Sequence, residues 1–275
     1  MKYKTTVICS TYNDVEFLSI VLDSLIYQST GDFELIVADD GSTSETKKAV
    51  HSFQKVAGFN VKHIWHEDKG WRKAKIHNEA IRAASGDLLI FIDGDCILGE
   101  NFVLDHKKVY ESERENYVLM CRRVELGERI TKLVSLKNYR RLLINSSLNY
   151  FSSIFTGDTH GGLRKFSVHN TNLRKILKAD GVKDLIGANF SLPKNLMLEI
   201  NGFNEYTDSI CGSEDGDIFV RLRNIGTKLI GKKYYAPMFH KFHRRGSRTV
   251  SDNYYKEILK DNNYKYAKHG LVRNG

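Results

Sequence analysis

The feature that most constrains the fold is an alternation of short apolar runs with amphipathic segments in the N-terminal part of the chain. Runs with the length and composition of buried strands lie at 5–9, 33–38, 61–65 and 88–92. Segments with helical spacing of apolar residues follow them at 17–25, 44–57, 70–84 and 102–115. This order predicts an α/β fold with a Rossmann-like, mainly parallel sheet flanked by helices. Ligands of such sheets bind beyond the carboxyl ends of the strands.

Two carboxylates follow the fourth predicted strand at once, as Asp93-Gly94-Asp95. Their spacing lets two oxygens share one hard divalent cation, and Gly94 lets the backbone bend close to it. Like charges this near each other repel unless a cation lies between them. A simple turn is the alternative, because Asp-Gly is common where strands end.

Polar clusters also follow the first two predicted strands, as Thr11-Tyr12-Asn13 and Asp39-Asp40-Gly41-Ser42. Asn13 and Glu16 have the spacing of a capping box, which predicts that Asn13 caps the first helix. Neither a glycine-rich dinucleotide fingerprint nor a phosphate loop is present in the sequence. This argues against a dinucleotide dehydrogenase and a P-loop nucleotidase.

The second half of the sequence is harder to interpret. It predicts a strand at 117–121, one or two amphipathic helices within 130–155, a strand at 184–192 and a short helix at 195–201. The span 130–155 either packs over the sheet, shapes an acceptor pocket or touches a membrane surface. Glu214, Asp215 and Asp217 precede a predicted helix at 218–224. Three acids in four residues exceed what the helix dipole needs, which indicates a site.

Composition adds a preference for anionic partners. The 275 residues carry a formal net charge of +9, which favours nucleotide phosphates, nucleic acid, acidic glycans or an anionic membrane. The sequence starts without a signal peptide and has no apolar stretch of about 18 residues. We therefore expect a cytoplasmic protein, with any membrane contact peripheral and at the inner face of the cell membrane.

Seven stretches in one order resemble the inverting, nucleotide-sugar-dependent glycosyltransferases of family 2, which have the GT-A fold. They are 7–13, 37–42, 70–81, 91–96, 187–191, 201–205 and 214–222. The last three look most like the galactosyltransferase-type C-terminal segment of β1,4-galactosyltransferases and bacterial chondroitin polymerases. Such a fold implies a GT-A domain at 1–250, with a nucleotide-binding half at 1–100, an acceptor and catalytic half at 100–250, and a basic helical tail at 251–275.

The resemblance implies a UDP-sugar donor and a set of residues around it. Relatives often have an arginine at the position of His77, so Arg72 or Lys75 is expected to supply positive charge here. Trp71 is expected in the core rather than as an aromatic platform for the base or the sugar, which is the alternative. The residues expected at the donor are Thr11, Tyr12, Asn13, Asp39, Asp40, Arg72, Lys75, His77, Asp93 and Gly94.

The resemblance also implies a bound Mn²⁺ or Mg²⁺ and a catalytic base. Asp95 is the expected metal ligand, with Asp93 beside it, and His240 before His243 is expected to complete the metal shell. Asp215 matches the family's catalytic base, with Glu214 assisting or binding the acceptor. The chemistry agrees, because an acceptor hydroxyl needs a carboxylate off the metal to take its proton. The basic run 244–248 is expected either in solvent or over the diphosphate.

We therefore expect a metal-dependent inverting transferase that moves a hexose or N-acetylhexosamine from a UDP-sugar to a hydroxyl of a glycan or lipid-linked glycan. Bacterial capsule or lipopolysaccharide synthesis is the expected pathway. A sugar-nucleotide nucleotidyltransferase is the first alternative, although it needs a glycine-rich, lysine-bearing loop after the first strand. A basic nucleic-acid-binding protein is the second, but no nucleic-acid motif accompanies the charge.

Overall fold

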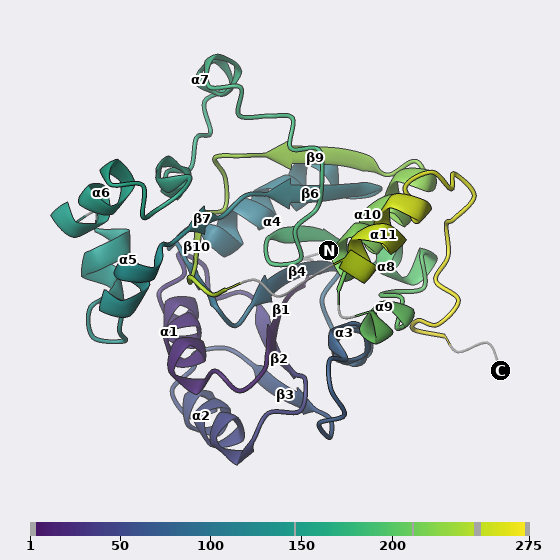
Figure 1. Ribbon diagram of the computed structural model, residues 1–275, viewed down its shortest axis with the longest axis horizontal. Coiled ribbons are helices and arrows are strands. Elements are labelled where there is room, and N and C mark those ends of the chain that lie inside the picture. Colours follow the sequence, from purple (N-terminus) through teal and green to yellow (C-terminus); the bar gives the residue numbers. More distant parts are fainter. Residues whose placement is uncertain (1–3, 146, 211, 245–248, 273–275) are drawn as a thin grey trace.

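The computed structural model describes residues 4–145, 147–210, 212–244 and 249–272. In these ranges the main sheet has seven strands, in the order β3-β2-β1-β4-β8-β6-β9 (Figure 1). Every pairing is parallel except those of β8 with β4 and with β6. The predicted mainly parallel sheet is therefore confirmed. Its strands are β1 (Thr5–Thr11), β2 (Glu34–Asp39), β3 (Val61–Trp65), β4 (Leu88–Asp93), β6 (Tyr117–Cys121), β8 (Phe190–Pro193) and β9 (Lys228–Lys232).

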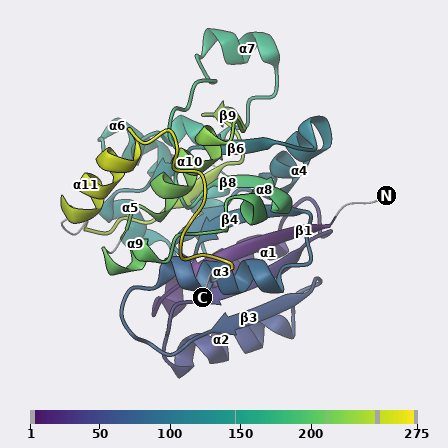
Figure 2. The ribbon, with the colours of Figure 1, turned by 90° about the vertical axis from the view of Figure 1, so that its right-hand side faces the viewer.

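Helices cover both faces of this sheet (Figure 2). Successive side chains of a strand point to opposite faces, so Val7 packs with α1, α2 and α4 whereas Ile8 packs with α3, α8 and α10. A sheet buried on both faces explains why its central strands are apolar throughout. The helices are α1 (Val15–Ile26), α2 (Ser44–Gln54), α3 (Lys73–Ala83), α4 (Phe102–Glu113), α8 (Lys194–Glu199) and α10 (Glu214–Asn224).

The cap of α1 differs from the prediction. Asp14, not Asn13, is the N-cap, and its side chain accepts a hydrogen bond from the Phe17 amide at 3.3 Å. Asn13 instead has a positive φ of 50°, and its side chain accepts from the Thr43 amide at 2.8 Å. Asn13 therefore ties the loop after β1 to the loop after β2, a tertiary role that local spacing cannot reveal.

A second, three-stranded sheet in the described chain was not predicted. It has the order β5-β10-β7, from β5 (Cys96–Leu98), β10 (Met238–His240) and β7 (Val124–Glu125). Its register places His240 opposite both Cys96 and Glu125. This small sheet brings a C-terminal segment to the residues that follow β4.

Short helical segments lie between β7 and β8; α5 and α6 lie together at the left of Figure 1, and α7 projects at the top. The helices predicted within 130–155 are present, whereas the strand predicted at 184–192 begins only at Phe190. These segments are α5 (Glu128–Leu133), the π-helix η1 (Arg140–Ile144), α6 (Leu148–Phe155), the 3₁₀ helix η2 (Gly162–Lys165) and α7 (Thr171–Ile176).

The C-terminal segment packs against α10. It contains α11 (Thr249–Ile258), and α9 (Tyr206–Ser209) lies near it. The hydroxyls of Tyr254 and Tyr264 donate to the buried Asp217 carboxylate at 2.6 and 2.7 Å. The expected domain boundaries stay predictions. Across the described residues, every helix is too short or too polar to cross a bilayer.

Candidate active site

A cleft of about 580 Å³ opens where β1, β2 and β4 end, as the fold predicts. Its volume is in the range of small-molecule sites. The first turn of α10 also lines this cleft, so elements from both halves of the sequence meet here. The predicted residues that line it are Thr11, Tyr12, Asp40, Asp93, Gly94, Asp95, Glu214, Asp215, His240 and His243.

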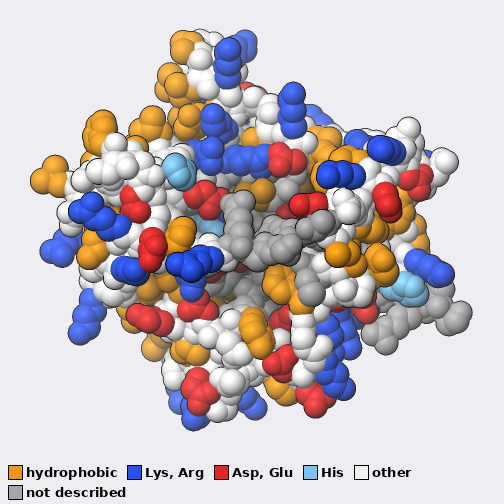
Figure 3. Space-filling model, viewed as in Figure 1, with side chains coloured by type: hydrophobic (Ala, Val, Ile, Leu, Met, Phe, Trp, Pro, Cys, Tyr) orange, Lys and Arg blue, Asp and Glu red, His pale blue; other side chains and the backbone are white. Residues whose placement is uncertain are grey.

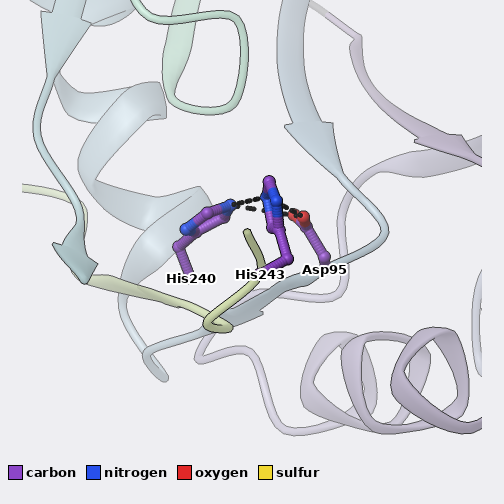
Figure 4. A group of neighbouring side chains, drawn as sticks. All are labelled: Asp95, His240 and His243. Atoms are coloured by element: carbon purple, nitrogen blue, oxygen red, sulfur yellow. Dashed lines mark hydrogen bonds and ion pairs between the residues drawn. The ribbon is translucent and has the colours of Figure 1, made fainter. Parts of the chain in front are cut away.

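Asp95, His240 and His243 form a cluster suited to a divalent cation (Figure 4). One ligand atom from each residue lies within 4.8 Å of the others. The Nε2 atoms of the two imidazoles are 3.2 Å apart, and the Asp95 Oδ2 lies 3.2 Å from His240 Nε2 and 3.7 Å from His243 Nε2. Imidazole nitrogens with a carboxylate oxygen are a donor set that Mn²⁺ and similar metals accept.

The small sheet sets the orientation of His240. Its pairing with β7 places the Glu125 Oε2 2.8 Å from His240 Nδ1, which leaves Nε2 facing Asp95. Arg123 in turn donates from Nε to Glu125 Oε1 at 2.7 Å. A carboxylate behind a metal-binding histidine is a common means of orienting the ring. Sequence reasoning missed Glu125 and Arg123, because nothing local shows that β7 lies beside β10.

Asp93 does not belong to this cluster, contrary to its expected role as a second metal ligand. Its Oδ1 accepts from the Ser10 hydroxyl at 2.7 Å and contacts the Lys73 ammonium at 2.9 Å. Burial raises the pKa of Asp93, but Lys73 and the Ser10 hydrogen bond outweigh burial and hold it well below its usual range. Asp93 is therefore ionised and paired with a lysine.

Lys73 supplies the positive charge in the cleft that the sequence analysis expected from Arg72 or Lys75. It lies at the start of α3 and also contacts the Glu214 Oε1 at 3.3 Å. The expected cations Arg72 and Lys75 do not line the cleft. The Arg72 guanidinium bonds to the Glu67 carbonyl, and the Lys75 amide donates to Asp208. The basic residues at 72–75 predict positive charge near the cleft, but the residue at which α3 begins determines which of their side chains faces it.

Gly94 is needed between the two aspartates because of backbone packing. Its amide donates to the Ser10 carbonyl at 2.7 Å, and a Cβ added there would lie 3.0 Å from both that carbonyl and the Thr11 hydroxyl. That spacing is tight for a side chain. The glycine therefore lets β4 and the end of β1 approach one another and place Asp93 and Asp95 in one cleft.

Two of the residues predicted to bind the donor, Asp39 and Asn13, lie outside the cleft lining and bond to the loop after β2. Asp39 is fully buried and accepts from the Ser42 amide at 2.8 Å while its other oxygen lies 2.8 Å from His63 Nε2. Asn13, described above, also lies outside the lining. Asp40 does line the cleft, and His66 and the Arg72 amide hold its carboxylate at 2.7 and 2.9 Å.

His77 and Trp71 are placed opposite to expectation. His77 is buried in the core, where its ring lies 4.5 Å from Phe203 and 5.6 Å from Phe91, and burial lowers its pKa to about 3. Neither ring nitrogen has a partner in the described chain. Trp71 is 46% exposed and lines the cleft rather than the core. The phase of α3 places His77 in the core and not in the cleft lining.

Asp215 has the properties of a base near neutral pH. Its carboxylate accepts from the Gly187 amide at 3.1 Å and the Gly216 amide at 2.8 Å. Burial and then the Glu214 charge raise its pKa to about 6, against the opposing effect of Lys73. Asp215 lies outside the metal cluster yet lines the same cleft as Asp95. A pKa near the working pH is what general base catalysis requires.

The fold is that of the GT-A glycosyltransferases, as comparison with solved structures shows. A mannosyltransferase from Pyrobaculum calidifontis, solved with GDP-Man and Mn²⁺, matches with a TM-score of 0.59 at 17% identity over 90% of this chain and 59% of that one. Staphylococcus aureus TarS residues 1–349, solved with UDP-GlcNAc, match with a TM-score of 0.59 at 15% identity over 96% of this chain and 74% of that one.

The chain belongs to glycosyl transferase family 2, whose model matches residues 6–171, more than half of its length. A validoxylamine A glucosyltransferase of Streptomyces hygroscopicus subsp. jinggangensis is 37% identical over 36% of this chain and 23% of its own. The chondroitin synthase of Escherichia coli is 33% identical over 33% of this chain and 13% of its own. The chain thus spans less than a quarter of either relative's length.

Proposed function

We propose that this chain is a metal-dependent inverting glycosyltransferase that uses a UDP-sugar. It moves a hexose or N-acetylhexosamine to a hydroxyl of a glycan or lipid-linked glycan. The observation that carries this proposal is the shared cleft, in which the Asp95, His240 and His243 cluster and the metal-free Asp215 lie together. Membership of family 2 supports glycosyl transfer over nucleotidyl transfer or nucleic-acid binding.

In this proposal, one group of residues activates the acceptor hydroxyl and another stabilises the leaving diphosphate. Asp215 takes the proton of the acceptor hydroxyl while that oxygen attacks the anomeric carbon. The bond from that carbon to the diphosphate breaks in the same step, so an α-linked donor yields a β-linked product. A divalent ion held by Asp95, His240 and His243 supplies positive charge beside the leaving diphosphate. Lys73 holds Asp93 and Glu214 in place.

The nucleotide lies, in this proposal, along the loops that follow β1 and β2. Thr11, Tyr12 and Asp40 line the cleft there, and Tyr12 is 53% exposed. Asn13 and Asp39 hold these loops through hydrogen bonds to the Thr43 and Ser42 amides. The stretch 201–222, which contains Glu214 and Asp215, acts as a galactosyltransferase-type segment. The part of the basic run at 245–248 lies outside the described residues.

The proposed setting is bacterial capsule or lipopolysaccharide synthesis at the inner face of the cell membrane. Relatives support a polymeric acceptor, since one is a chondroitin synthase and another acts on poly(ribitol-phosphate). Leu148 and Phe155 at the two ends of α6 are each 88% exposed, and Ile176 of α7 is 77% exposed. Hydrophobic side chains gather over α6 and α7 with Lys and Arg between them (Figure 3). We assign this face to peripheral contact with an anionic membrane.

Hydrolysis of the donor tests the function without a known acceptor. We expect at least one of UDP-glucose, UDP-galactose and their N-acetyl forms to release UDP slowly in Mn²⁺. Proton NMR of the first sugar released is expected to show the β-anomer, because a single displacement inverts the anomeric carbon. An α-anomer would contradict inversion. Pyrophosphate release from UTP and a sugar 1-phosphate would favour the nucleotidyltransferase instead.

A further inference from the structure

A second pocket, of about 350 Å³, is strongly basic, and some of its lining residues are near neighbours in the sequence of residues that line the cleft. We name it the basic pocket. In Figure 3, Lys and Arg side chains gather between the middle of the molecule and α7. The charged residues that line the basic pocket are Arg122, Arg164, Lys178, Lys183, Lys233, Asp180 and Asp184.

Both carboxylates of the basic pocket are already paired. Asp184 pairs with Arg122, and Asp180 pairs with Arg174, which lies outside the pocket lining. Among the residues described, no carboxylate pairs with the remaining cations Arg164, Lys178, Lys183 and Lys233. Like charges crowded in this way repel one another unless an anion joins them.

The two arginines of the basic pocket are held in place rather than free in solvent. The Arg122 side chain is 19% exposed, and its Nη1 donates to the Asp184 carbonyl at 3.2 Å. Arg164 donates from Nη1 to the Arg123 carbonyl at 2.9 Å, and its buried Nε has no hydrogen-bond partner in the described chain. Fixed guanidinium groups suit planar recognition of phosphate or carboxylate.

The chain itself links the basic pocket to the acceptor side of the cleft. Arg123, next to Arg122, lines the cleft. Ile186 and Gly187, just after Asp184, line it too, and the Gly187 amide holds Asp215. An acceptor whose hydroxyl reaches Asp215 can therefore extend a neighbouring unit into the basic pocket.

We propose that the basic pocket binds an anionic group, phosphate or carboxylate, carried by the acceptor glycan. The unpaired cations supply the charge, and the two fixed arginines supply the geometry. This inference rests on the proposed function, because it names the chemical class of the acceptor at that same site. It makes the enzyme selective for phosphate-bearing or uronate-bearing glycans over neutral ones.

Binding of simple probes tests this directly. Glycerol 1-phosphate and methyl β-D-glucuronide, with glycerol and methyl β-D-glucoside as neutral partners, are titrated by NMR with and without saturating UDP. Only the anionic probes are expected to bind, and UDP should not displace them. In Lys178→Gln/Lys183→Gln their affinity should fall about tenfold or more. Both lysines are exposed, so the variant should fold.

The matched control is Lys47→Gln/Lys48→Gln, which removes the same charge from exposed positions on α2. Equal affinity in the two double variants, or equal binding of neutral and anionic probes, would overturn the proposal. Tighter binding of the phosphate probe assigns a phosphate-bearing acceptor, and tighter binding of the glucuronide assigns a uronate. Donor hydrolysis should continue in both variants. Failure of the parent to hydrolyse any donor would instead count against the glycosyltransferase itself.

Discussion

At the scale of single residues, the proposed catalytic base Asp215 can be tested by one substitution. Asp215→Asn keeps the shape but cannot take a proton, so we expect the transfer or hydrolysis rate to fall by about 10²–10⁴. UDP affinity should stay nearly unchanged, because Asp215 lies outside the cluster proposed to hold the metal and the diphosphate. Turnover assays and calorimetric titration of UDP measure the two effects. A loss of UDP affinity as large as the loss of rate would contradict the assignment of Asp215 as the base.

The pH profile follows from the same carboxylate. Burial and then Glu214 raise the pKa of Asp215 to about 6, while Lys73 opposes them and Tyr255 also faces it. Since the base must be ionised, the rate should rise with pH through a midpoint of about 6. Glu214→Gln removes a negative charge, so its midpoint should lie at lower pH. A parent rate that is flat across this range would contradict the prediction.

Residues that follow strands were predictable, whereas residues that depend on helix phase or remote pairing were not. Asp95 follows β4 and Asp215 lies at the start of α10, so their place in the order of elements was informative. His240 ends the unpredicted strand β10 and was expected only from the family resemblance. Lys73 and His77 lie on one helix, and their faces depend on where α3 begins. Glu125 joins the site only through its pairing with His240.

At the scale of elements, a remote carboxylate caps the helix that carries Lys73. Arg72, the N-cap of α3, makes no side-chain capping bond. Asp208 of α9 accepts instead from the amides of Ala74 and Lys75 at 2.8 and 3.1 Å. Asp208→Ala should lower the free energy of unfolding by about 1 kcal/mol, as measured by urea denaturation. Asp208→Asn keeps one acceptor oxygen, so its free energy of unfolding should fall less. Equal stability of Asp208→Ala and the parent would show that this cap does not stabilise the protein.

Long elements were predictable and short ones were not, for a physical reason. The strands and helices of the first half show a clear period because each buries one or both of its faces along its whole length. Strands β5, β7 and β10 have two or three residues each, too few to show a period. Helix α11 packs through tyrosine hydroxyls onto Asp217, a contact that apolar spacing does not reveal.

At the scale of the whole molecule, the exposed apolar side chains of α6 allow a test of the proposed membrane contact. Leu148→Glu/Phe155→Glu should reduce co-sedimentation with vesicles that contain phosphatidylglycerol, because both side chains are lost from the contact and negative charge is added. Val56→Glu, at a 67% exposed position after α2, is the control and should bind as the parent does. If the parent binds neutral and anionic vesicles equally, or neither, the proposed contact is wrong.

The central claim is that Asp95, His240 and His243 hold a cation that binds the diphosphate of a UDP-sugar in the cleft shared with Asp215. The most direct measurement is a thermal-shift panel of UDP-, GDP- and TDP-sugars with and without Mn²⁺, on the parent and on Asp95→Ala. The parent should be stabilised by a UDP-sugar in Mn²⁺ and much less in its absence, and Asp95→Ala should lose that dependence. Stabilisation that is identical with and without Mn²⁺ in both proteins would contradict the claim.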